Sequence, residues 1–265
     1  MIAIASLSLC LVIVCGYIAF PAFPHVTSSA SVRSGGMVQQ IIEKTSNIEA
    51  YSPFWTMLCA VAYSLVSVTL IYRYFEKTQT PEILFFALYC FSLSLECARI
   101  MIPLKEIRPF PAMFLITATQ ILLFGRFFGL SSLFAASVFA AGFDIQKQRN
   151  VFFMLILASL IIALNVPVDS LAWDTSLKAL NGYNPMLNIV ETCILTVTII
   201  TFLISAYMKT SITYIFLGSG TLMAFAGRNI LVKSDTLITP LPGLLLLSAG
   251  TWLICSRLHK EYLWL

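Results

Sequence analysis

The chain has 265 residues, of which 59% are hydrophobic and 11% charged, with a mean hydropathy of +0.90 and a formal net charge of +4. About a quarter of the residues in a water-soluble domain are charged, so this chain cannot cover a folded surface with polar groups. The composition therefore excludes a soluble globular domain. Without a clustered basic face, the charge also argues against nucleic-acid binding.

The apolar residues come in separate blocks that are long enough to cross a hydrocarbon core of about 30 Å. Backbone amides in lipid must be satisfied within the segment, and the blocks lack the alternation of barrel strands, so they predict transmembrane α-helices. The sequence therefore predicts an all-α integral membrane protein of about eight helices. The blocks are residues 2–23, 54–75, 83–104, 112–142, 151–168, 187–208, 212–232 and 241–255.

The first block, residues 2–23, has no basic residue before its apolar core and no clean small-residue cleavage site. We therefore expect an uncleaved anchor, with a signal peptide as the alternative. A helical apolar rhythm over residues 37–48 predicts a short helix at the membrane surface. These features suggest an N-terminal anchor and extracytoplasmic segment over residues 1–53, followed by a seven-helix bundle over residues 54–265.

Five ionisable residues lie inside the later blocks, where each charge is costly in lipid and needs a partner or a purpose. Glu96 and Arg99 are three residues apart, so they share a helix face and can neutralise each other. Two interpretations remain open: structural ion pairs that lock helix contacts, or a polar pocket in the outer half of the membrane. Three arginines against two glutamates leave one positive charge over, so a pocket would favour an anionic ligand. The candidate cluster comprises Glu96, Arg99, Arg126, Glu191, Arg228 and Asn229.

The depths of two of these charges predict a specific ion pair. Residues 187–208 and 212–232 are joined by a very short connection, so their helices are expected to be antiparallel neighbours. Glu191 lies about one turn inside the first helix, and Arg228 lies about one turn before the end of the second. Because the depths match, we expect Glu191 to pair with Arg228.

Small residues mark two helices for close packing. Gly125 and Gly129 form a Gly-x-x-x-Gly motif, and Gly218 and Gly220 lie on a small-residue face of the seventh block. Such residues let helices approach closely, either within one bundle or in a dimer. We favour packing within the bundle.

Sequence signals for catalysis are weak. The two histidines, His25 and His259, lie near the expected interfaces, and no His-Glu-x-x-His motif or phosphate-binding loop is present. Neither a metal site nor a cofactor is predicted. We therefore expect a non-enzymatic protein, although acid–base chemistry at Glu96 or Glu191 stays open.

Basic residues near the block ends favour a cytoplasmic N-terminus in the cytoplasmic (inner) membrane. In architecture alone, the seven-helix core resembles the membrane modules of bacterial seven-helix sensor proteins. That resemblance implies that an output domain would come from another chain. We expect a receptor-like binding bundle or a membrane subunit of a larger complex, and the alternative is a small secondary transporter or channel for an anionic solute. The expected partners are membrane lipids, a protein partner or second copy, and an anionic small molecule or lipid, with no nucleic acid.

Overall fold

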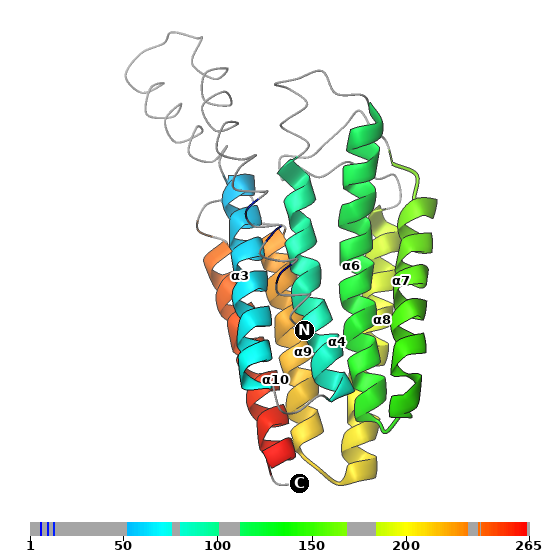
Figure 1. The fold of residues 1–265 in the computed structure, drawn as a ribbon, viewed down its shortest axis with the longest axis vertical. Coiled ribbons are helices and arrows are strands. Elements are labelled where there is room, and N and C mark those ends of the chain that lie inside the picture. Colours follow the sequence, from blue (N-terminus) through cyan, green and yellow to red (C-terminus); the bar gives the residue numbers. More distant parts are fainter. Residues whose placement is uncertain are drawn as a thin grey trace.

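The computed structural model describes residues 52–75, 80–100, 112–168, 184–232, 238 and 240–263, together with Ser6, Cys10 and Ile13. Seven helices in these ranges are long and apolar enough to cross a membrane, and they stand side by side in one bundle (Figure 1). The expected first span and the surface helix over residues 37–48 lie outside the described residues, apart from those three. The elements are α3 Ser52–Tyr74, α4 Pro81–Ser92, η1 Leu93–Ile100, α6 Ala112–Ala140, η2 Ile145–Lys147, α7 Gln148–Asn165, α8 Asn184–Lys209, α9 Thr213–Val232 and α10 Pro240–Leu263.

Local sequence signals explain where several helices begin and end. Pro81 occupies the first turn of α4, where its missing N–H costs nothing. Gly142 adopts a φ of 101° after α6, a left-handed conformation that glycine tolerates and that turns the chain back. The Asp144 side chain then accepts a hydrogen bond from the Gln146 N–H at 3.2 Å and caps η2. The α6–α7 connection is therefore a tight turn.

Helix three of the predicted set departs from a regular α-helix. It is α-helical from Pro81 to Ser92 and continues as a 3-10 helix from Leu93 to Ile100. A 3-10 helix has three residues per turn, so side chains three apart stand directly above one another. This geometry places Glu96 and Arg99 in line.

The helices differ strongly in how much of their surface the bundle covers. Helix α4 contacts α3 and α6, and its Tyr89 hydroxyl donates to the Ala224 carbonyl of α9 at 3.0 Å. Helix α7 packs on α6 at the edge of the bundle and buries only Ser159 and Ala163. The bundle is thus built around α4, and α7 presents most of its apolar surface outward.

Helices α9 and α10 pack backbone to backbone at glycines. A Cβ atom added at Gly227 would lie 2.6 Å from the Leu247 nitrogen and 2.7 Å from the Gly243 oxygen. One added at Gly250 would lie 2.7 Å from the Gly220 oxygen. Two glycine pairs, each linking α9 to α10, therefore set the spacing of these helices.

The Gly-x-x-x-Gly motif of α6 receives α4 and η1 within the same chain. A Cβ atom at Gly125 would lie 3.0 Å from Leu95, and one at Gly129 would clash with the Ser92 hydroxyl. Gly218 is less constrained, because its added Cβ would lie at an ordinary distance of 3.5 Å from Phe202. Gly125, Gly129 and Gly220 thus lie in tight helix contacts inside the bundle.

Candidate functional site

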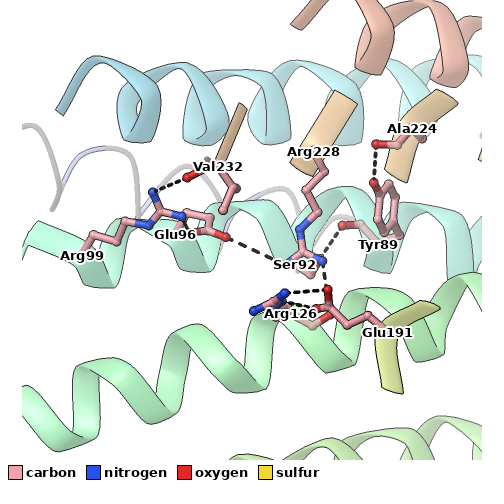
Figure 2. Close-up of polar contacts among 9 residues, drawn as sticks. All are labelled: Tyr89, Ser92, Glu96, Arg99, Arg126, Glu191, Ala224, Arg228 and Val232. Carbon is pink, nitrogen blue, oxygen red and sulfur yellow. Dashed lines mark hydrogen bonds and ion pairs between the residues drawn. The ribbon is translucent and has the colours of Figure 1, made fainter. Parts of the chain in front are cut away.

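Two arginines and one glutamate form a buried trio between η1 and α9. Arg99 Nη2 lies 2.6 Å from Glu96 Oε2, and Arg228 Nη2 lies 3.9 Å from Glu96 Oε1 (Figure 2). The three residues are only 3–6% exposed. We call Glu96, Arg99 and Arg228 the trio, in which one carboxylate is shared by two guanidinium groups.

A second set of charges joins α6 to α8. Arg126 Nη2 donates to Glu191 Oε2 at 2.6 Å, and Arg126 Nε contacts the other carboxylate oxygen. Arg126 Nη2 also donates to the Asn188 amide oxygen at 2.9 Å. About a quarter of the Arg126 side chain is exposed (26%), whereas that of Glu191 is buried. We call Arg126 and Glu191 the pair, which is balanced in charge.

The trio and the pair touch through the backbone of α6. Arg228 Nη1 donates to the Arg126 carbonyl oxygen at 3.2 Å, as Figure 2 shows. The structure therefore brings five of the six predicted cluster residues together from η1, α6, α8 and α9. Asn229 follows Arg228 along α9 and is half-buried, and the cluster's ion pairs do not include it.

The expected pairing of Glu191 with Arg228 is wrong. Helices α8 and α9 do contact each other, as predicted, but both also approach α6 at Arg126. The Arg126 guanidinium takes the Glu191 carboxylate, while Arg228 turns to Glu96. Depth and chain order alone could not reveal the intervening helix.

Local packing explains how the charges meet. Gly125 and Gly129 let η1 approach α6 closely, and the Ser92 hydroxyl at this contact is satisfied by the Tyr89 carbonyl at 2.7 Å. Arg228 lies four residues before the end of α9, which is about 6 Å along the helix axis. The trio therefore lies near the end of the bundle at which η1 and α9 terminate.

Backbone carbonyls satisfy only part of the trio. Arg99 Nη1 donates to the Val232 oxygen at a long 3.4 Å. Within the described part of the chain, Arg99 Nε has no hydrogen-bond acceptor although the residue is 3% exposed. Counting only the described cluster residues, the trio carries two positive charges and one negative charge. A buried polar atom without a partner and an excess charge are both costly in the interior of a protein.

Asn188 and Glu82 are polar residues that the predicted cluster does not include. The amide oxygen of Asn188, on α8, accepts a hydrogen bond from the Arg126 guanidinium that also holds Glu191. Glu82, one residue after Pro81, is buried at the opposite end of α4 and lines a cavity of about 20 Å³ with Thr221. Acids are common in the exposed first turn of a helix, so the burial of Glu82 could not be predicted from its position in the sequence.

The described residues contain no group of three or more His, Cys, Asp or Glu side chains that could hold a metal ion. A scan against models of known protein families and a search of curated proteins found no match for this chain.

Proposed function

We propose that the chain is an integral membrane protein that binds an anionic group against the trio and acts as a receptor-like binding bundle. The observation that carries this proposal is the trio itself, with two buried guanidinium groups sharing one carboxylate. The proposal is one of binding, with no catalytic step assigned to the cluster.

The outer surface of the bundle supports the membrane part of the proposal. Large apolar side chains on α7 and α8 are exposed, among them Phe153 (61%), Met154 (69%) and Leu203 (50%). An apolar surface that extends along whole helices is an aggregation hazard in water, whereas lipid tails cover it without loss. Lipid is therefore the solvent that fits this surface.

The distribution of basic side chains supports an orientation. By sequence, the connections after η1, α7 and α9 carry four basic residues, Lys105, Arg108, Lys178 and Lys233, whereas the opposite end of the bundle carries seven. Under the positive-inside rule this end faces the cytoplasm, so the trio faces the outer side of the membrane. The seven basic residues at this end are Arg73, Lys77, Lys147, Arg149, Lys209, Arg257 and Lys260.

Charge balance supports the anion. An uncompensated charge in a low-dielectric interior costs several kcal/mol, and the Val232 and Arg126 carbonyls offset only part of that cost. A carboxylate or phosphate oxygen beside Arg99 Nε would accept from this donor, which no described residue satisfies, and would also neutralise the excess charge of the trio. Guanidinium groups suit both anions because their planar N–H groups match the spacing of the oxygens.

The test uses a variant in which the charges of the trio balance without a ligand. Arg99→Leu leaves Glu96 with Arg228 as a neutral pair, and Arg73→Gln removes a charge from the far end as a matched control. Each full-length protein is purified in mild detergent and melted with and without octanoate or inorganic phosphate. We expect at least one anion to raise the Tm of the wild type and of Arg73→Gln, but not of Arg99→Leu. The proposal fails if neither anion raises the wild-type Tm, or if Arg99→Leu responds as the wild type does.

A further inference from the structure

A groove lies between the first turns of α4 and the α6–α7 turn, at the end of the bundle opposite the trio. Its volume is about 460 Å³, within the range of small-molecule sites. None of its residues belongs to the trio or the pair. The groove is lined by Leu84 and Leu88 from α4, by Gln146 from the α6–α7 turn, and by Gln148, Arg149 and Phe152 from α7, among others.

The polarity of this groove changes with depth. Arg149 and the amide side chains stand at the rim, where the helices begin. Leu84 and Leu88 lie three and seven residues inside the start of α4, or about 4 and 10 Å along its axis. The wall thus changes from polar to apolar over the distance that separates a lipid headgroup from its acyl chains.

The charged side chain that lines the groove is basic. Arg149 is exposed at the rim, and its exposed neighbour Lys147 lies beside it in the turn. Among the described side chains, two acids lie at this end of the bundle: Asp144, whose carboxylate caps η2 by accepting from the Gln146 N–H at 3.2 Å, and Glu82, which is buried in the first turn of α4 beside a separate cavity. A negatively charged group at the rim therefore meets a guanidinium, two amide side chains and a nearby ammonium.

We infer that this groove binds one anionic glycerophospholipid, with the phosphate at Arg149 and an acyl chain along Leu84, Leu88 and Phe152. The inference rests on the membrane embedding proposed above, and it is independent of any ligand at the trio. The lipid would come from the leaflet at the basic end of the bundle. It would also fill the space that the peripheral helix α7 leaves beside α4, and so would tie α7 to the core.

The experiment measures lipid binding to the full-length protein by native mass spectrometry. The detergent-purified chain is titrated with phosphatidylglycerol and with phosphatidylcholine of the same acyl chains. One basic residue near a membrane surface contributes roughly a fivefold change in affinity for an anionic lipid. We expect one phosphatidylglycerol to bind the wild type, about fivefold weaker binding by Arg149→Gln, and no change in Arg73→Gln at the same end. Leu84→Asn should weaken the binding of both lipids, because it places an amide on the acyl-chain wall.

Three outcomes would overturn the inference. Equal binding of phosphatidylglycerol by Arg149→Gln and the wild type would show that Arg149 does not contact the headgroup. Equal losses in Arg73→Gln and Arg149→Gln would mean that surface charge in general attracts the lipid. Displacement of the lipid by excess inorganic phosphate would mean that an anion alone occupies the rim. The anion response of Arg149→Gln at the trio should match that of the wild type, so failure here leaves the proposed function standing.

Discussion

The trio and the pair use the same two kinds of side chain and differ in balance and exposure. The pair matches one Arg126 with one Glu191, adds the Asn188 amide, and leaves about a quarter of the arginine side chain exposed. The trio buries Arg99 and Arg228 around a single carboxylate. We propose that charge balance, rather than residue type, separates the pair, whose charges are matched among the described residues, from the trio, which would accept an anion from outside.

The largest expected effect comes from removing the shared acid of the trio. Glu96→Leu leaves two buried guanidinium groups without a carboxylate, so we expect a loss of about 3–5 kcal/mol in stability. Thermal or SDS-induced unfolding in detergent measures this loss. A Glu96→Leu protein as stable as the wild type would mean that the arginines reach other acceptors.

Stability lost by a single substitution in the pair should be recovered when its partner in the pair is also replaced, but not when Arg228 of the trio is replaced. Glu191→Leu is expected to cost roughly 3 kcal/mol, because it leaves the Arg126 charge at the α6–α8 contact with only the Asn188 amide. The double variant Arg126→Leu/Glu191→Leu should recover much of the loss, whereas Glu191→Leu/Arg228→Leu should not. A double-mutant cycle separates these cases, and coupling of Glu191 to Arg228 instead would refute the observed pairing.

The packing of Gly227 against α10, next to Arg228, involves no charged side chain and can be compared with the trio and the pair. Gly227→Ala forces a Cβ atom against the backbone of α10, so we expect a loss of about 1–3 kcal/mol that no second substitution of a charged residue relieves. Gly218→Ala is the matched control, because its Cβ would make an ordinary contact. Equal Tm values for the two variants would contradict the close approach of α9 and α10.

The smallest expected change in stability tests the charge balance of the trio. In anion-free buffer, Arg99→Leu should change the stability by less than about 1 kcal/mol or raise it, because removing the excess charge offsets the lost contacts. Unfolding of Arg99→Leu and Glu96→Leu under the same conditions measures the difference in stability between the two variants. A loss as large as that of Glu96→Leu would make Arg99 a structural partner.

Much of the helical framework follows from the sequence, since long apolar blocks and prolines at their ends reveal the seven described helices. The i, i+3 spacing of Glu96 and Arg99 also revealed their contact. The choice of partner for Glu191 depends on how α6 is placed between α8 and α9, which is a tertiary property. The 3-10 continuation after Ser92 likewise carries no local signal, because its residues have an ordinary helical composition. Gly243 and Gly250 have the same seven-residue spacing as Gly220 and Gly227, but spacing alone does not name the facing helix.

The most direct test of the central claim is an experimental density map of the wild-type protein in lipid nanodiscs, viewed at the trio. We expect non-protein density within about 3 Å of Arg99 Nε. We also expect this density to be absent from Arg99→Leu, in which Glu96 and Arg228 remain paired. A carboxylate of the chain itself bonded to Arg99 Nε would contradict the account, because the trio would then be balanced without a ligand.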